Sequence, residues 1–278
     1  MSEPRLKSLN LYLQRLGFSA PPAPTLETLR QLQLRHTGAF PFENLTTLSG
    51  EPVLIDLPSI EQKTLHQSRG GYCYELNNLF FALLRELGFD ARAISGRVVM
   101  GQPEGAWTAR THRLSLVILD GVRYITDVGF GGMVATAPLM LDTGDEQSTP
   151  HEPYRIEHHA DGYTLRARVG NEWRAMYIFD LQRQEDIDYS VGNWYVSTHP
   201  ESSFVKQLMV ARTGEGWRKT LNNGSFAIHR IGSESERRQV ADVDELIGLL
   251  ESEFGIRAPE NAQLRQTLER LIEPKAPA

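Results

Sequence analysis

The chain has 278 residues, of which 40% are hydrophobic and 23% are charged, with ordinary amounts of glycine and proline. This composition excludes collagen-like and globally disordered proteins and predicts a large buried core spread over roughly two domains. The 29 basic and 35 acidic residues give a net charge of −6, which argues against a nucleic-acid partner.

Cysteine usage and the N-terminus indicate a reducing compartment. Cys73 is the only cysteine, so neither an intrachain disulfide nor a cysteine-rich metal site can form. The opening segment, MSEPRLKSLNLYLQRLGF, lacks the apolar core of a signal peptide. The apolar runs are far shorter than the about 20 residues that cross a bilayer. We therefore expect a cytoplasmic protein with no membrane partner and no metal site.

Helices are predicted in the first third of the sequence. Leucines recur at helical spacing over residues 6–16, and Gly17 follows as a C-terminal cap. Thr25 marks the start of a second helix that extends to about Gly38. A third helix is predicted over residues 73–87, because one face is apolar and a glycine lies just past its end.

Short β-like runs begin at about Ala91. Turn signals at Asp120-Gly121 and Asp161-Gly162 separate some of them, so we expect a mostly antiparallel sheet or small barrel in the middle of the chain. The predicted strands cover residues 91–100, 112–119, 122–128, 163–169 and 173–179. In the last third we expect a loop over 197–203, strands over 205–211 and 226–231, and helices over 243–254 and 260–272.

Cys73 stands out because of its surroundings. A lone cysteine is most often a small buried hydrophobe. Here it follows Gly70-Gly71 and begins the predicted helix, so the thiol lies at or near a helix N-terminus. The unpaired N–H groups and the positive end of the helix dipole favour thiolate over thiol, and the nearby Arg69 adds positive charge. This setting is typical of a catalytic nucleophile.

His112 is the histidine best placed to serve as a base, because it opens an apolar strand. If Asp120-Gly121 is a two-residue hairpin loop, the resulting register puts His112 and Asp127 on the same face as diagonal neighbours. Two polar side chains at the end of an apolar face are expected to bond to each other. The alternative is that Asp127 only caps a turn before Gly129.

A Cys-His-Asp arrangement, as in cysteine proteases, predicts acyl transfer. Asp127 would orient His112, His112 would take the thiol proton, and Cys73 would attack a carbonyl and carry the acyl group as a thioester. These residues alone leave the donor and the acceptor open: a cysteine peptidase, a transglutaminase-like enzyme and an acyltransferase all fit. The Cys-Gly-Ser-Cys-Trp signature of one peptidase group is absent. A catalytically silent protein that binds an aromatic ligand is a further alternative.

Four motifs occur in order along the chain: Pro-Phe-Glu-Asn at 41–44, Arg-Gly-Gly-Tyr-Cys-Tyr-Glu-Leu-Asn at 69–77, Thr-His-Arg at 111–113 and Thr-Asp-Val-Gly-Phe-Gly-Gly at 126–132. Together they resemble the arylamine N-acetyltransferases, including the bacterial N-hydroxyarylamine O-acetyltransferases. The resemblance covers most of the chain and is loosest in the C-terminal third. It implies an α+β fold with three parts: a helical bundle over 1–90 that carries the cysteine, an antiparallel β-barrel over 91–190 that carries the histidine and the aspartate, and an α/β lid over 191–278.

The resemblance also implies a reaction. Acetyl would pass in ping-pong fashion from acetyl-CoA, a co-substrate and not a permanently bound cofactor, to an arylamine, arylhydrazine or N-hydroxyarylamine. The physiological acceptor and the oligomeric state stay open. Matched residue by residue, the catalytic triad is Cys73, His112 and Asp127. The implied acceptor-binding residues are Phe42, Phe130 and Phe204, and the implied coenzyme contacts are Thr108, Gly129 and Gly131.

Each of these binding roles has a plainer interpretation. The glycines at 129, 131 and 132 could be ordinary turn residues, and no helix is predicted to follow them as in a phosphate-binding loop. The three phenylalanines could be core residues. The cations that would bind the coenzyme phosphates are not identified by any motif; Arg97, Arg113 and Lys206 are among the possibilities.

Overall fold

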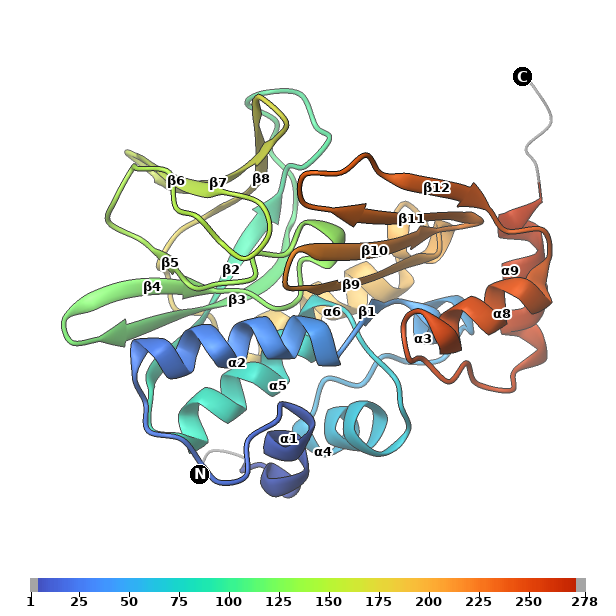
Figure 1. Cartoon of the computed structure of the whole chain (residues 1–278), viewed down its shortest axis with the longest axis horizontal. Coiled ribbons are helices and arrows are strands. Elements are labelled where there is room, and N and C mark those ends of the chain that lie inside the picture. The colour runs from blue at the N-terminus through green and yellow to red at the C-terminus, as the bar shows by residue number, and fades with distance from the viewer. Residues whose placement is uncertain (1–4, 274–278) are drawn as a thin grey trace.

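The computed structural model describes residues 5–273 and contains two antiparallel sheets with helices packed around them (Figure 1). The N-terminal helices are blue to teal in Figure 1, and all of them except α3 (Leu45–Leu48), which packs with the C-terminal helices, share one core. They are α1 (Leu9–Arg15), α2 (Leu26–Ala39), α3 (Leu45–Leu48), α4 (Leu57–Glu61), the π-helical turn η1 (Gln62–His66) and α5 (Cys73–Glu86). The three longer helices predicted from the sequence are confirmed.

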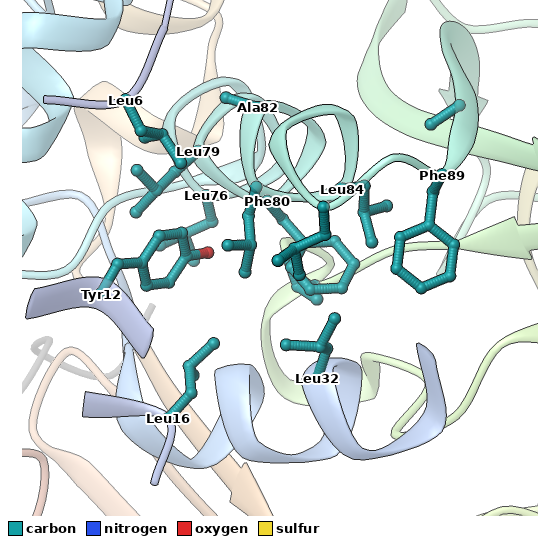
Figure 2. Packing of buried hydrophobic residues seen from close by; sticks show 14 of the residues in the cluster. Leu6, Tyr12, Leu16, Leu32, Leu76, Leu79, Phe80, Ala82, Leu84 and Phe89 are labelled. Carbon is teal, nitrogen blue, oxygen red and sulfur yellow. The ribbon is translucent and has the colours of Figure 1, made fainter. Parts of the chain in front are cut away.

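The helix boundaries follow from local chemistry. Thr25 caps α2, because its side chain accepts a hydrogen bond from the Thr28 N–H. Gly17 and Gly88 follow α1 and α5 with φ of +75° and +85°, a conformation that glycine adopts without strain. Leucine and aromatic side chains of α1, α2 and α5 then meet in one core, and Figure 2 shows Leu76, Phe80 and Leu84 on the side of α5 that faces Leu32 of α2.

The central part of the chain forms a seven-stranded antiparallel sheet with the order β5-β4-β3-β2-β8-β7-β6. Gln147 connects its two edge strands: its backbone pairs with Tyr154, and its side-chain amide bonds the backbone of Met140 at 2.7 and 2.8 Å. The sheet is therefore a nearly closed barrel with an apolar interior. Its strands are β2 (Asp90–Val98), β3 (Arg110–Leu119), β4 (Val122–Thr126), β5 (Leu139–Met140), β6 (Tyr154–His159), β7 (Gly162–Val169) and β8 (Glu172–Phe179).

The hairpin between β3 and β4 has the predicted loop. Leu119 pairs with Val122, and the loop residues Asp120 and Gly121 have φ of +51° and +78°. Positive φ at both positions is the backbone of a two-residue hairpin turn. In the β6–β7 hairpin the loop lies one residue earlier than the predicted signal, because Gly162 is already paired in the strand.

A second, five-stranded sheet has the order β1-β9-β10-β11-β12 and is orange in Figure 1 except for β1. One of its faces packs on the C-terminal helices through residues such as Val210, Leu221 and Phe226. The opposite face is open to a cavity described below. The elements are β1 (Phe42–Glu43), β9 (Met209–Gly214), β10 (Trp217–Asn222), β11 (Ser225–Arg230), β12 (Glu236–Gln239), α7 (Ser203–Lys206), α8 (Val243–Ser252) and α9 (Ala262–Ile272).

Two predictions in the last third had the wrong boundaries. The loop expected over 197–203 is present over 199–202, because it follows a helix, α6 (Asp186–Thr198), that the sequence did not suggest. Its buried positions include Gly192 and Asn193, so the apolar stripe that identifies a helix is interrupted. The strand expected from 205 begins at Met209 instead, because Ser202 caps the short helix α7 before it.

Within residues 5–273, no helix combines the length and the apolar composition needed to cross a membrane.

Candidate active site

Cys73 is the first residue of α5 and is 4% exposed. The Tyr72 N–H that precedes it donates to the Glu75 carboxylate at 3.1 Å, which fixes the start of the helix. The preceding glycines are required by packing: a Cβ at Gly70 would overlap the Pro41 carbonyl, and one at Gly71 would lie 2.7 Å from Glu75. The predicted position of the thiol at a helix N-terminus is confirmed.

A buried ion-pair network holds the loop in front of Cys73. Arg69 donates to Glu43 at 2.9 Å, and Lys63 donates to Glu75 at 2.6 Å. Burial raises the pKa of Glu43, but the charges of Arg69 and Lys63 outweigh this and hold it below its usual range. The network therefore ties β1, η1 and the start of α5 together through charged groups.

His112 and Asp127 lie together as the hairpin register predicts. His112 Nε2 and Asp127 Oδ2 are 2.6 Å apart, and both side chains are buried. Nδ1 is thus the ring nitrogen left for other partners. The Cys73 thiol interacts with the His112 ring and donates to the Thr111 carbonyl at 3.6 Å. The alternative in which Asp127 caps a turn without meeting His112 is excluded, although Asp127 does also accept a bond from the Gly129 N–H at 2.9 Å.

The electrostatics of this pair favour its charged form. Burial lowers the pKa of His112, but the charge and hydrogen bond of Asp127, together with Cys73, raise it to about 10. Burial raises the pKa of Asp127, but His112, the Asn77 amide and the Gly129 N–H together lower it below its usual 3.8. The pair is therefore an imidazolium–carboxylate at neutral pH.

Asn77 is a site residue to which the sequence analysis gave no role. Its Nδ2 donates to Asp127 Oδ1 at 2.8 Å and to the Arg113 carbonyl at 2.6 Å, and its Oδ1 accepts from the Val128 N–H at 2.9 Å. Asn77 thus joins α5 to β3 and to the segment after β4. Its position four residues after Cys73, on the same helix face, was the available signal.

Two aromatic rings pack against the His112 imidazole and against each other. The ring centroids of Phe130 and Tyr177 lie 5.1 and 4.9 Å from that of His112, and the two aromatic rings are 5.0 Å from each other. These contacts fix the plane of the imidazole in addition to the hydrogen bond that His112 Nε2 donates to Asp127.

A cavity of about 750 Å³ opens at Cys73 and His112. Asp127 is not part of its wall and lies buried behind His112. All six residues expected to contact substrates line the cavity, namely Phe42, Phe130, Phe204, Thr108, Gly129 and Gly131. Phe42 and Phe204 lie 6.1 Å apart, and the Phe204 ring is 5.3 Å from that of Tyr72, so one end of the cavity is an aromatic pocket.

Two of the predicted coenzyme contacts also have a packing role. A Cβ at Gly129 would lie 2.8 Å from the Cα of Cys73 and from Asn77 Nδ2. Gly131 has a φ of +71° and lies against the Phe42 ring at the start of the short turn η2 (Gly131–Met133). The glycines allow the segment after β4 to approach α5 closely while still facing the cavity.

The floor of the cavity is the open face of the five-stranded sheet. One register row crosses every strand, in the order Phe42, Ala211, Thr220, Ala227, Arg237. Four strand spacings put its ends about 19 Å apart. The middle of the row carries small side chains, so a long ligand can lie across the strands.

Basic side chains lie on this face of the sheet at the end that is farthest from Phe42. Arg218 and His229 face each other across β10 and β11, and both line the cavity with Arg237. Arg218 is ion-paired with Glu152, whereas Arg237 is exposed and has no ion pair with a carboxylate among residues 5–273. Burial, Arg218 and Arg237 lower the pKa of His229, in that order. Sequence reasoning missed these three residues.

The cations suggested from the sequence lie elsewhere. Arg97 stacks on Trp107 outside the cavity wall, with 5.4 Å between the guanidinium and the ring centroid. Arg113 is buried, and Lys206 bonds Glu201 at 2.8 Å. In the described part of the chain, no group of three His, Cys, Asp or Glu side chains is arranged to hold a metal ion.

Comparisons with known proteins agree with this arrangement. The sequence profile of a family described as N-acetyltransferase matches residues 25–263. An arylamine N-acetyltransferase from Mycolicibacterium smegmatis is 41% identical over 88% of this chain and 90% of its own length. The chain belongs to the arylamine N-acetyltransferase family. It is an acetyltransferase, with the α+β fold of that family.

Two further relatives bear on substrates. An arylamine N-acetyltransferase / N-hydroxyarylamine O-acetyltransferase from Salmonella typhimurium is 40% identical over 89% of this chain and 88% of its own length. The solved structure of the Mycobacterium marinum arylamine N-acetyltransferase in complex with CoA is 41% identical, with a TM-score of 0.90 over 95% of this chain and 99% of that one.

Proposed function

We propose that the protein transfers acetyl from acetyl-CoA, through a thioester on Cys73, to arylamines, arylhydrazines or N-hydroxyarylamines. The observation that carries the proposal is the contact of the Cys73 thiol with His112, whose ring is bonded to Asp127, at the wall of one cavity. A nucleophile, a base and a group that orients the base are the parts that covalent acyl transfer requires. The CoA complex of the Mycobacterium marinum relative supports the choice of donor.

In the first half-reaction Cys73 Sγ, whose proton has already passed to His112 to form the imidazolium, attacks the carbonyl carbon of acetyl-CoA. The N–H groups of Cys73 and Tyr74, the first two residues of α5, have no partner within the helix and are placed to stabilise the oxyanion. Collapse of the tetrahedral intermediate breaks the bond to the CoA sulfur, which receives the proton from His112. Acetyl is left on Cys73.

In the second half-reaction the amine nitrogen attacks the carbonyl carbon of the acetyl-cysteine. Neutral His112 takes one proton from the amine, and the bond to Sγ breaks, so that Cys73 leaves as a thiolate beside an imidazolium. Asp127 keeps its charge throughout, because its role is to orient and stabilise the ring. An N-hydroxyarylamine would react in the same way through its oxygen.

The two ends of the cavity suit these two substrates. The rings of Phe42, Phe130 and Phe204 offer offset and edge-to-face contacts to an aryl group beside the thiol. Arg237 provides positive charge, and Arg218 and His229 provide hydrogen-bonding groups, for the phosphates of a donor that lies along the row of small residues.

The deciding experiment is intact-protein mass spectrometry after brief incubation with acetyl-CoA alone, followed by addition of an anisidine. We expect one acetyl adduct, lost as acetylated amine appears. Cys73→Ala is the matched control, and because there is only one cysteine its adduct should be absent.

Other outcomes would support the alternative functions. An adduct that persists in Cys73→Ala would remove the nucleophile assignment. No adduct, with a thiol that iodoacetamide modifies rapidly, would favour a peptidase or transglutaminase-like enzyme. No adduct with an unreactive thiol would favour a silent binding protein.

A further inference from the structure

Arg113 is a buried cation without a carboxylate partner. It follows His112 on β3 and is 4% exposed. Its guanidinium lies 4.3 Å from the ring centroid of Tyr189 on α6 and 5.6 Å from that of Phe81 on α5. Among residues 5–273, no carboxylate lies within ion-pair distance of it.

The other buried arginines of the described chain are different. Arg69 is paired with Glu43, and Arg218 is paired with Glu152. Burying a charge is costly unless other groups compensate it. Aromatic rings offset part of this cost for Arg113 through cation–π contacts. Unlike a carboxylate, they leave its positive charge uncancelled.

Hydrogen bonds to the backbone of β3 connect the Arg113 segment to Cys73 and to Asp127. Thr111, whose carbonyl accepts from the Cys73 thiol, lies two residues before Arg113 on the same side of the strand. The Asn77 amide holds the Arg113 carbonyl and Asp127 together at 2.6 and 2.8 Å. The Arg113 guanidinium also packs on Tyr189, which belongs to the same buried cluster as Cys73, so the guanidinium and the thiol lie in one buried region and interact electrostatically.

The buried charges at the site balance only when Cys73 is ionised. Asp127 and the His112 imidazolium cancel, which leaves one positive charge on Arg113. A guanidinium does not deprotonate in a protein. A thiolate at Cys73 would supply the missing negative charge.

Other ionisable groups face this region from α5 and α6. Tyr72 and Tyr74 come from α5 or its cap, and Tyr189 comes from α6; all three are phenols, and burial raises the pKa of each. Asp186, at the start of α6, is exposed to solvent, which screens its charge. None of them replaces the thiolate as a buried anion at neutral pH.

We propose that Arg113 is a positioning residue that stabilises the Cys73 thiolate through space, without touching either substrate. The proposal rests on the nucleophilic role of Cys73 proposed above. Arg113 lies on the face of β3 opposite His112 and is absent from the cavity wall, so it does not bind the donor phosphates.

The test is the rate of Cys73 alkylation by iodoacetamide as a function of pH, followed by intact mass in wild type, Arg113→Gln and Arg113→Lys. A nearby opposite charge is worth about one pH unit or more. We expect Arg113→Gln to raise the pH of half-maximal alkylation by about one unit and to slow alkylation about tenfold at neutral pH. Arg113→Lys should keep most of the wild-type profile. Arg110→Gln is the control, because Arg110 is on the same strand but pairs with the half-exposed Asp180.

A folded Arg113→Gln with the wild-type profile would overturn the proposal, and so would an equal shift in Arg110→Gln. Circular dichroism establishes folding, and Arg113→Met, which keeps the apolar stem between the two rings, replaces a glutamine variant that does not fold.

A measurement on the wild type tests the same idea. Buried charges are weakly screened, so the pH of half-maximal alkylation should stay the same between low salt and 1 M salt. A large rise with salt would assign the effect to surface charges. If the wild-type thiol is not selectively reactive, the proposed function fails; if only the Arg113 variants behave as wild type, this inference alone fails.

Discussion

Replacing Asn77 by alanine tests whether the triad is held by the helix that carries the cysteine. The substitution removes the amide that bonds Asp127, and it leaves the Arg113 carbonyl and the Val128 N–H without partners in a buried place. A buried polar group left unsatisfied costs about 1–3 kcal/mol. Two such groups give a loss of unfolding free energy of about 2–6 kcal/mol. One kcal/mol lowers Tm by about 2–4 °C in a domain of this size range, so we expect a fall of at least about 4 °C.

The same substitution should slow the reaction. A hydrogen bond to a charged group contributes about 1.5–3 kcal/mol, and every 1.36 kcal/mol is tenfold in rate. We therefore expect kcat/KM for arylamine acetylation to fall about 10- to 100-fold in Asn77→Ala, because Asp127 and with it His112 lose part of their support.

Asn78→Ala is the matched control for both measurements. Asn78 is the next residue of the same helix and makes one bond, to the Ile55 carbonyl at 2.8 Å, away from the triad. It should lower Tm less than Asn77→Ala and leave kcat/KM near wild type. Equal effects of the two variants on Tm and rate, by thermal unfolding and steady-state kinetics, would refute the reasoning.

Three further variants test other parts of the site. The His112–Asp127 pair stabilises the fold fully between about pH 3.8 and 6.5, which are the pKa values of Asp127 and His112 in the unfolded chain. This stabilisation is lost as the pH rises through about 10, the pKa of His112 in the fold, or falls through the lowered pKa of Asp127. The Tm advantage of wild type over Asp127→Asn should therefore be widest in that window and narrow toward pH 10. Gly129→Ala should lower stability by about 1–3 kcal/mol and abolish acetylation, since its Cβ would meet the Cys73 backbone at 2.8 Å. Arg237→Gln should raise KM for acetyl-CoA about five- to tenfold, the factor for roughly 1–1.4 kcal/mol, with kcat unchanged.

Each variant has a control. Gly144→Ala adds a Cβ with nothing within 4 Å and should be silent in the unfolding and acetylation assays. Arg238→Gln changes the opposite face of β12, where Arg238 packs over Phe226, and should leave KM for acetyl-CoA alone. The interpretations are wrong if the Asp127→Asn difference in Tm is constant with pH, if Gly129→Ala resembles Gly144→Ala, or if Arg237→Gln and Arg238→Gln change KM equally.

The parts of the fold that were predictable are those with local causes. The hairpin at Asp120-Gly121 sets its own register through two residues, and this register brought His112 to Asp127. By contrast, β1 has two residues and pairs Phe42 with Ala211, far along the chain. So short a strand has no periodicity to detect, and its partner is chosen by tertiary packing.

The same division separates the site residues. Cys73 was identifiable because glycines and a helix start surround it in sequence. Arg218, His229 and Arg237 share a cavity only because three strands pair in one register, which no local pattern reports. Arg113 was a possible phosphate ligand on charge alone, and only burial on the face of β3 away from the cavity excludes that role.

The triad and the substrate walls are held by different kinds of structure. His112 and Asp127 are fixed by β3, by Asn77 on α5 and by the Gly129 backbone, so removing one contact leaves others in place. The acceptor end depends on short elements, because Phe204 belongs to the one-turn helix α7, which the Asn44 amide holds through the Phe204 carbonyl at 2.8 Å. Substitutions in α7 can therefore alter which acceptor binds while the nucleophile and its base keep their geometry, whereas substitutions at the α5–β3 junction change every substrate alike.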